Sequence, residues 1–187
     1  MTNREKYILS IYEELSDMGK HENVKLVKNT VNDGIYIKKT LKNYNIEIYK
    51  ILKNRQIKGI PKVYEIIEDE KELIIIEEYI HGLTLDKKYN KTDVETVKKI
   101  MEQLCNILKQ LHNMNPPIIH RDIKPTNIIV SNDDVVYLVD FNISREYDEN
   151  QSVDTVIMGT QGYASPEQCG FAQTDCRSDI YSIGMLM

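Results

Sequence analysis

The feature that most constrains this chain is a polar loop of eight residues, His-Arg-Asp-Ile-Lys-Pro-Thr-Asn at positions 120–127. Apolar segments flank the loop on both sides, at positions 118–119 and 128–130. Such apolar runs predict short buried strands. A loop anchored at both ends by buried strands can direct several polar side chains at one point, so this stretch is the first candidate for a functional site.

Three side chains of this loop suit the chemistry of phosphates. Asp122 could accept a proton, Lys124 could meet negative charge, and Asn127 could ligate a hard cation through its amide oxygen. Any one of these residues alone would be ordinary in a surface loop. The ordered set His-Arg-Asp-x-Lys-Pro-x-Asn, however, is the catalytic-loop signature of protein kinases. The chain resembles that family, and bacterial serine/threonine kinases most of all.

A second motif, Asp-Phe-Asn at positions 140–142, follows 18 residues after Asp122 and directly after an apolar strand at 135–139. The family has Asp-Phe-Gly at this place, and its aspartate chelates Mg²⁺. The resemblance therefore implies a metal role for Asp140. Asn142 departs from the family pattern, but asparagine tolerates a positive φ better than most residues, so we expect the turn to form.

Residues 159–167 resemble the segment that ends the activation loop of the family. The resemblance implies that Thr160 contacts Asp122 and Lys124. Lys124 together with this segment resembles serine/threonine rather than tyrosine kinases.

The resemblance also implies two roles for groups around the catalytic loop. Arg121 could clamp a phosphate on the activation loop, where Ser152 and Thr155 are the preferred phosphorylation candidates. Asp179 is expected to be structural and to bond the backbone amides near His120.

Residues 24–27 and 35–37 alternate as a hairpin does, and the family carries a phosphate-gripping lysine on the second of these strands. Both Lys38 and Lys39 could fill this role. Side chains of a strand alternate between its faces, so only one of the two can point into the nucleotide site. Lys39 is favoured because Leu41 then falls on the expected apolar position.

The glycine-rich loop of the family is degenerate in this chain. With Val24 as the valine of the motif, the three glycine positions hold Asp17, Gly19 and Glu22. Glycines matter here because backbone amides must approach the phosphates closely. Only Gly19 matches, and it could equally be a plain turn residue.

A helix predicted at residues 45–52 resembles the regulatory helix of the family, with Glu47 as the partner of the strand lysine. Residues 77–82 resemble the hinge between the lobes, where the backbone from Glu78 to Ile80 would bond an adenine edge. Glu77 occupies the gatekeeper position, which is usually apolar, and a carboxylate there needs a partner that the sequence does not identify.

The remaining elements are predicted from periodicity. Residues 59–67 and 73–76 indicate two strands, and residues 94–111 carry apolar side chains at helical spacing, with a structural His112 at the end. Residues 4–15 suit either a helix or an entering strand.

Composition is that of an ordinary soluble protein: 187 residues, a hydrophobic content of 41% and a net charge of −5. The mild acidity gives no indication of nucleic-acid binding. Three cysteines without a C-x-x-C pair indicate reduced intracellular thiols, and no signal peptide or membrane-spanning segment is visible. We therefore expect a cytoplasmic protein; its oligomeric state is not predicted.

Together these features predict an α+β fold like that of protein kinases. Residues 1–80 would form a small antiparallel-sheet lobe with one helix, a nucleotide-binding sheet and the hinge. Residues 81–187 would form an incomplete, mainly helical lobe with the catalytic loop, the activation segment and the start of the central helix. A kinase domain normally continues with further helices, so we expect a truncated domain that is marginally stable or sticky.

The resemblance implies a protein serine/threonine kinase that uses ATP and Mg²⁺ and acts on protein hydroxyls. The groups at 39 or 38, 122, 127 and 140 would then converge on one triphosphate. An alternative is a nucleotide-binding pseudokinase or inactive remnant that acts as a scaffold; the degenerate glycine loop and Asn142 favour it. A small-molecule kinase of the aminoglycoside type is a third option, and it is disfavoured by Arg121 and the 159–167 segment.

Overall fold

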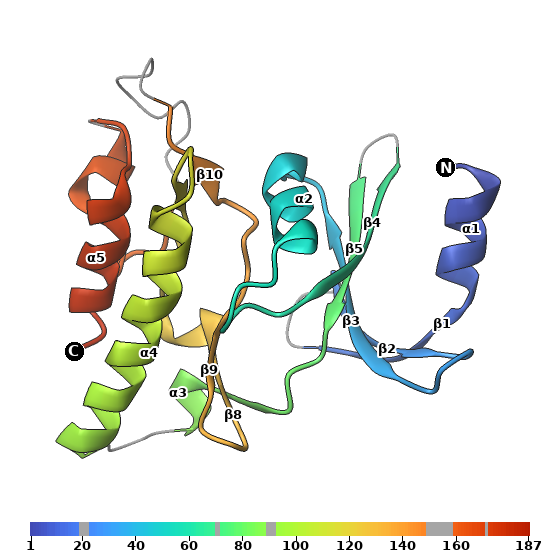
Figure 1. Ribbon diagram of the computed structural model, residues 1–187, viewed down its shortest axis with the longest axis horizontal. Helices are drawn as coiled ribbons and strands as arrows, with labels where there is room; N and C mark the ends of the chain where they lie inside the picture. The colour runs from blue at the N-terminus through green and yellow to red at the C-terminus, as the bar shows by residue number, and fades with distance from the viewer. Residues whose placement is uncertain (19–22, 70–71, 89–92, 149–158, 171) are drawn as a thin grey trace. The chain divides into compact units, whose positions relative to one another are not determined.

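The structure is a computed structural model that describes the chain except for residues 19–22, 70–71, 89–92, 149–158 and 171 (Figure 1). The chain divides into two compact units. The first comprises Met1–Gln56 and Pro61–Ile80, and the second comprises Ile57–Ile60 and His81–Met187. The short segment Ile57–Ile60 thus goes with the second unit, although residues 1–80 were predicted as one lobe.

The first unit is built on a five-stranded antiparallel sheet with the strand order β1-β2-β3-β5-β4. Its elements, in chain order, are α1 (Asn3–Ser10), β1 (Tyr12–Asp17), β2 (Val24–Asn29), β3 (Ile35–Leu41), α2 (Ile46–Asn54), β4 (Val63–Asp69) and β5 (Glu72–Glu78). The hairpins predicted from the alternating runs are confirmed. The segment that suited either a helix or a strand contains both, α1 and then β1.

Helix α2 forms because its residues combine an N-terminal cap with an apolar face. The side chain of Asn45 accepts a hydrogen bond from the amide of Glu47, and Ile48, Tyr49 and Leu52 are buried. The helix contacts β4 of the sheet. One lobe helix was predicted, and α1 is an additional one.

Alternation along β3 separates the two faces of this sheet. Ile37, Lys39 and Leu41 are buried, whereas Tyr36 and Lys38 are intermediate in exposure and lie on the other face. On that other face three tyrosine rings, Tyr12, Tyr36 and Tyr64, pack edge to face with centroids 5.6 and 5.0 Å apart.

The second unit combines helices with two small sheets. Its elements are β6 (Gly82–Thr84), α3 (Leu85–Lys88), α4 (Val94–His112), β7 (Ile118–Ile119), the 3₁₀ turn η1 (Pro125–Asn127), β8 (Ile128–Ser131), β9 (Val136–Leu138), β10 (Arg145–Glu146), η2 (Pro166–Cys169) and α5 (Cys176–Gly184). Strands β6, β8 and β9 form one antiparallel sheet, and β7 pairs with β10.

The predicted amphipathic helix is α4, which Asp93 caps by accepting a hydrogen bond from the amide of Thr96. The buried face of α4 consists of Ile100, Leu104, Ile107, Leu108 and Leu111. This face packs against β7, β9 and α5. The helix therefore supplies apolar support beneath β7, the strand that precedes the polar loop, and beneath β9.

Ile57–Ile60 joins the second unit through β9. The amide of Leu138 donates to the carbonyl of Gly59 at 2.8 Å. Gly59 has a φ of 86°, and a Cβ at this position would collide with the side chain of Ile107. Glycine is therefore required at this close approach.

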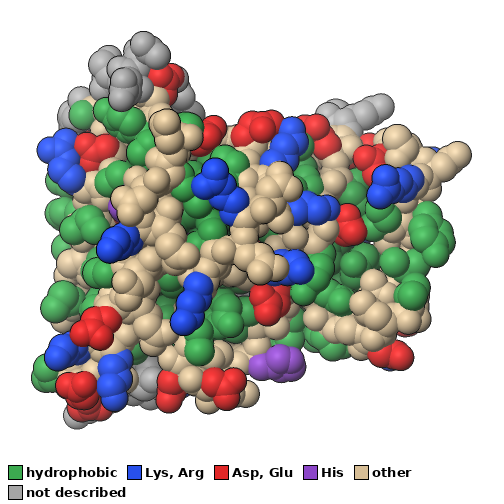
Figure 2. Space-filling view, viewed as in Figure 1, with side chains coloured by type: hydrophobic (Ala, Val, Ile, Leu, Met, Phe, Trp, Pro, Cys, Tyr) green, Lys and Arg blue, Asp and Glu red, His purple; other side chains and the backbone are tan. Residues whose placement is uncertain are grey.

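On the face drawn in Figure 2, acidic and basic side chains are interspersed rather than gathered into a patch of one sign. All three cysteines are free. Among the described residues, none of the helices combines the length and apolar character needed to cross a membrane.

Candidate active site

The polar loop at residues 120–127 is fixed at both ends by fully buried strands. The side chains of Ile118, Ile119 and Ile128 are inaccessible to solvent, and Ile123 in the middle of the loop is 1% exposed. Pro125 begins the short turn η1, which the amide of Asn127 closes by donating to the carbonyl of Lys124 at 2.9 Å. The apolar anchors therefore hold the backbone, while the side chains of Asp122 and Lys124 stay partly exposed.

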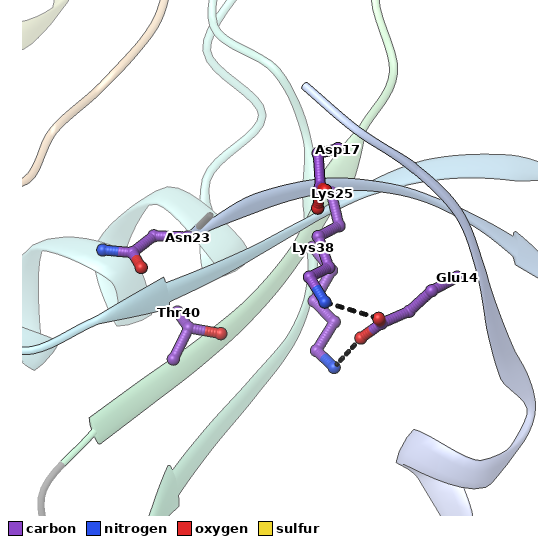
Figure 3. A pocket seen from close by; sticks show the side chains of 6 residues that line it. All are labelled: Glu14, Asp17, Asn23, Lys25, Lys38 and Thr40. Carbon is purple, nitrogen blue, oxygen red and sulfur yellow. Dashed lines mark hydrogen bonds and ion pairs between the residues drawn. The ribbon is translucent and has the colours of Figure 1, made fainter. Parts of the chain in front are cut away.

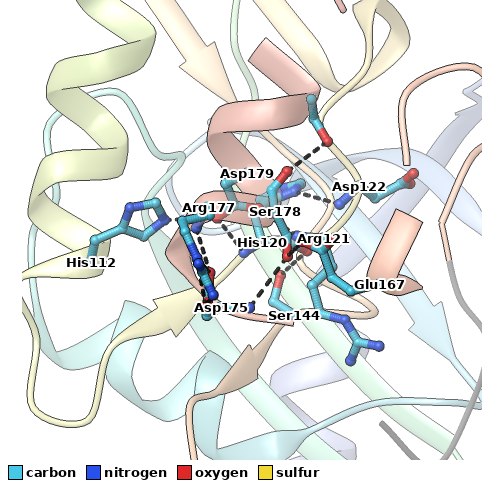
Figure 4. A network of polar contacts seen from close by, with 11 residues as sticks. His112, His120, Arg121, Asp122, Ser144, Glu167, Asp175, Arg177, Ser178 and Asp179 are labelled. Carbon is cyan, nitrogen blue, oxygen red and sulfur yellow. Dashed lines mark hydrogen bonds and ion pairs between the residues drawn. The ribbon is translucent and has the colours of Figure 1, made fainter. Parts of the chain in front are cut away.

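A carboxylate from α5 holds the start of this loop (Figure 4). Asp179 is fully buried, and its two oxygens accept hydrogen bonds from the amides of His120 and Arg121, each at 2.9 Å. Nε2 of His112 lies 2.8 Å from the same carboxylate. The structural role predicted for Asp179 is thus confirmed, and His112 supports it from α4. Arg121 itself has a φ of 71°, a left-handed conformation that these bonds help to maintain.

His120 connects the loop to the segment that carries Asp140. Its Nε2 is 3.1 Å from the carbonyl of Val139, and its Nδ1 is 3.3 Å from the amide nitrogen of Asp122. A ring that donates through Nε2 and accepts through Nδ1 is the neutral tautomer. Burial lowers the pKa of His120, although nearby carboxylates oppose the shift. The geometry and the pKa therefore agree on an uncharged ring, which also packs edge to face on Phe141 at 4.7 Å.

Asp122 is the centre of a network of charge-assisted hydrogen bonds. Its Oδ1 accepts from the hydroxyl of Thr160 at 2.7 Å, and its Oδ2 accepts from the amide of Asn127 at 2.9 Å. The ammonium of Lys124 lies 2.8 Å from Oδ2 and donates to the Thr160 hydroxyl at 2.8 Å. The contact of Thr160 with Asp122 and Lys124, predicted from the resemblance, is confirmed. The network fixes both oxygens of the carboxylate.

The segment that carries Thr160 is tied to the loop by a residue that the sequence analysis missed. Gln168 is buried, and its amide nitrogen donates to the carbonyl of Arg121 at 2.7 Å. Its amide oxygen accepts from the backbone amide of Ser165 at 3.1 Å. The pattern Ser-x-x-Gln at 165–168 is a capping box and was a usable signal for this turn.

Asp140 follows β9, as the sequence predicts, but its backbone differs from the expectation. The left-handed φ lies at Asp140 (70°) and not at Asn142, so the turn does not depend on the tolerance of asparagine for positive φ. The amide of Ser144 closes this turn by donating to the carbonyl of Phe141 at 3.2 Å. Asn142 therefore replaces the family glycine without a conformational conflict.

The donor set around Asp140 fits a magnesium ion. Oδ1 of Asp140 is buried without a hydrogen-bond partner among the described residues. The amide nitrogen of Asn127 donates to Asp122, which leaves its oxygen as the atom able to ligate. The described residues contain no cluster of three or more histidine, cysteine, aspartate or glutamate side chains suited to a metal. Magnesium does not need such a cluster, because it is bound by one or two protein oxygens together with substrate phosphates and water.

In the first unit the two candidate lysines point to opposite faces of the sheet. Lys39 is 7% exposed, and its ammonium lies 2.6 Å from the carboxylate of Glu77. Lys38 lies on the other face, where its ammonium pairs with Glu14 at 2.9 Å. There it lines a hollow of about 460 Å³ together with Glu14, Asp17, Asn23, Lys25 and Thr40 (Figure 3). The hollow is thus on the face opposite Lys39, and Lys39 is the lysine placed in a buried charged site.

The partner of Lys39 differs from the expectation. Glu47 was predicted to hold this lysine, but its side chain is 58% exposed and pairs with Lys50 at 2.7 Å, one turn along α2. Glu77 lies beside Lys39 instead, on the neighbouring strand β5. The gatekeeper carboxylate, which had no partner in the sequence analysis, is therefore paired with the lysine.

The other residues expected near a nucleotide are placed as follows. Val24 is paired with Lys39 across β2 and β3, so both side chains lie on the same face. Glu78 ends β5, and its amide donates to the carbonyl of Lys62 at 2.8 Å, so this amide is not available to an adenine. Ile80 is 8% exposed. Gly19 lies outside the described residues, as do the phosphorylation candidates Ser152 and Thr155.

Comparison with known proteins agrees with this geometry. Residues 13–187 match the family model described as protein kinase domain, and the chain belongs to the protein kinase family. It is similar to a probable serine/threonine-protein kinase of Clostridium acetobutylicum, with 35% identity over 131 residues, which are 69% of this chain and 20% of that protein.

Two proteins of a Synechocystis species are also similar. The identity is 33% over 133 residues with serine/threonine-protein kinase D (67% of this chain, 26% of that protein). With serine/threonine-protein kinase A it is 36% over 133 residues (64% of this chain, 26% of that protein). The matches cover about a fifth to a quarter of the length of these relatives.

Proposed function

We propose that this chain carries the catalytic centre of a serine/threonine protein kinase, which transfers the γ-phosphoryl group of ATP to a hydroxyl of a protein substrate. The observation that carries the proposal is the fixed carboxylate of Asp122, held by Thr160, Lys124 and Asn127 at 2.7–2.9 Å. Phosphoryl transfer asks the protein mainly for positioning and for charge, and this network supplies both. The names of the similar proteins support serine/threonine specificity.

Each polar group has a distinct role in this proposal. Asp122 orients the acceptor hydroxyl and takes its proton, while Lys124 offsets negative charge on the phosphoryl group. Asn127 and Asp140 would hold Mg²⁺, which supplies positive charge opposite the phosphates when bound. Lys39 contacts the phosphates. The amide of Glu78 is already bonded to the carbonyl of Lys62, so the remaining backbone groups from Glu78 to Ile80 form the hydrogen bonds to the adenine. We further propose a cytoplasmic location, which the three free cysteines support.

The test is the variant Asp122→Asn, assayed for transfer of labelled phosphate to a general protein substrate such as casein. Loss of the base is expected to lower the rate about 10²- to 10⁴-fold, with Mg-ATP affinity retained. The matched control is Glu65→Gln, because Glu65 forms a partly exposed ion pair with Lys53 of the first unit and has no role in the proposed site. An unchanged rate in Asp122→Asn would contradict the role of Asp122.

A second candidate is a nucleotide-binding protein without transferase activity. Two observations favour it: Lys39 pairs with Glu77 rather than with Glu47, and Asp17 stands at a glycine position of the phosphate loop. A Mg²⁺-dependent increase in melting temperature with ATP, together with no phosphate transfer, would select this candidate.

A further inference from the structure

The ion pair between Lys39 and Glu77 differs from the other ion pairs of the first unit in its burial. The two side chains are 9% and 11% exposed, and the charged atoms lie 2.6 Å apart. The pairs of Lys38 with Glu14 and of Lys50 with Glu47 have exposures of 22–58%. Exposed pairs contribute little, whereas two charges removed from water must be held in good geometry.

The pair arises from the register of the sheet. On β3 and β5, Lys39 is opposite Ile75, and Glu77 is opposite Ile37. Lys39 and Glu77 are therefore diagonal neighbours, two residues apart along the strands, and their side chains point to the same face. Long side chains reach each other across this diagonal, so the pairing of β3 with β5 brings the two charges together.

The carboxylate of Glu47 on helix α2 is engaged within its own helix. Glu47 lies in the first turn of α2, where its carboxylate is held by Lys50 of the same helix. The carboxylate beside Lys39 therefore comes from β5, a central strand of the sheet that pairs with both β3 and β4.

We propose that Glu77 is the positioning residue of Lys39, which holds the ammonium of this lysine charged and oriented for a nucleotide phosphate. The inference rests on the proposed function, because it assigns the phosphate contact to Lys39. It replaces the helix carboxylate of the family with a carboxylate in the sheet, so the acidic partner of Lys39 comes from β5 rather than from α2.

The first experiment measures the pair itself, without nucleotide. Lys39 is acylated with an amine-reactive ester at constant pH, and its rate of modification is followed by peptide mass spectrometry. Burial favours the neutral amine, which is the reactive form, so Glu77→Gln is expected to accelerate the acylation of Lys39 about tenfold. Glu77→Asp, which keeps the charge, should restore most of the protection. Glu65→Gln is the matched surface control.

The second experiment measures phosphate positioning in the same variants. In Glu77→Gln the KM for Mg-ATP is expected to rise about tenfold, with a smaller change in kcat, because a charge-assisted contact has been removed. Glu77→Asp should recover part of the loss. Glu47→Gln should raise KM much less than Glu77→Gln does.

The outcomes separate the inference from the proposed function. If Glu47→Gln raises KM and accelerates the acylation while Glu77→Gln does neither, the inference is overturned. If the wild-type protein neither binds nor uses Mg-ATP, the proposed function fails, whereas the acylation experiment still decides whether Glu77 holds Lys39. If Glu77→Gln does not fold, Glu77→Met, which also removes the charge at similar side-chain length, replaces it, and an acylation rate and KM equal to those of the wild type would then count against the inference.

Discussion

The two units hold their charged groups in different ways. In the second unit, Asp122, Lys124 and Asn127 come from one short loop and contact one another directly. In the first unit, Lys39 on β3 pairs with Glu77 on β5, which is 38 positions later in the sequence. A group held by its own loop can be anticipated from a motif, whereas a group held across a sheet depends on strand pairing.

The largest expected effect tests the anchor of the loop in the second unit. Asp179→Ala removes a fully buried carboxylate that accepts from the amides of His120 and Arg121. Because these donors would lose their partner, we expect the free energy of unfolding to fall by about 3–5 kcal/mol. Urea unfolding measures the change. Asp86→Ala, on the exposed surface of α3, is the control and should cost less than about 1 kcal/mol. Equal decreases in the free energy of unfolding in the two variants would show that Asp179 stabilises the fold no more than an exposed residue does.

A second, somewhat smaller effect distinguishes the two lysines of the first unit. Lys39→Met leaves the carboxylate of Glu77 buried without the ammonium 2.6 Å away, so we expect a loss of about 3 kcal/mol together with the loss of Mg-ATP binding. Lys38→Met breaks a more exposed pair with Glu14 and should cost less than about 1 kcal/mol. Thermal unfolding and nucleotide titration measure both variants. A larger effect in Lys38→Met would exchange the roles assigned to the two faces of the sheet.

The smallest effect concerns the neutral ring of His120. Its pKa is lowered by burial, so the unfolded chain takes up this proton at a higher pH than the folded chain does. The free energy of unfolding should therefore decrease as the pH falls below about 6.5, by at most about 1.4 kcal/mol per pH unit, until the folded pKa is reached.

Urea unfolding at pH 7.5, 6.5 and 5.5 tests the role of this histidine. The difference in slope between the wild type and His120→Asn isolates its contribution from those of the other histidines. Identical slopes would show that His120 does not titrate differently in the folded and unfolded states.

Much of the candidate site in the second unit was predictable because its parts fall in sequence motifs that resemble those of the family. The contacts of Asp122 with Lys124 and Thr160, and those of Asp179 with the loop amides, agree with the roles that the family resemblance implies. Gln168 was missed because a side chain that bonds a backbone carbonyl 47 residues away leaves no periodic signal.

The prediction for the first unit failed at one pairing. Glu47 has the expected place on a helix, but its carboxylate stays on the surface beside Lys50. Glu77 lies two residues from Ile75 on one strand, and Lys39 lies two residues from Ile37 on another. Each charged side chain therefore points to the same face as an apolar one, and the sequence places both charges on a buried face. It does not say that β3 and β5 are neighbours, because strand order is set by long-range packing.

The sequence by itself therefore determined the family, the strands and helices, and the polar loop with its apolar anchors, because these depend on residue order and on periods of two or 3.6 residues. Only the tertiary structure decided which lysine is buried and which carboxylate it meets. The cost of burying a charge depends on every neighbour that the fold brings within a few ångströms, and most of those neighbours are distant in the chain.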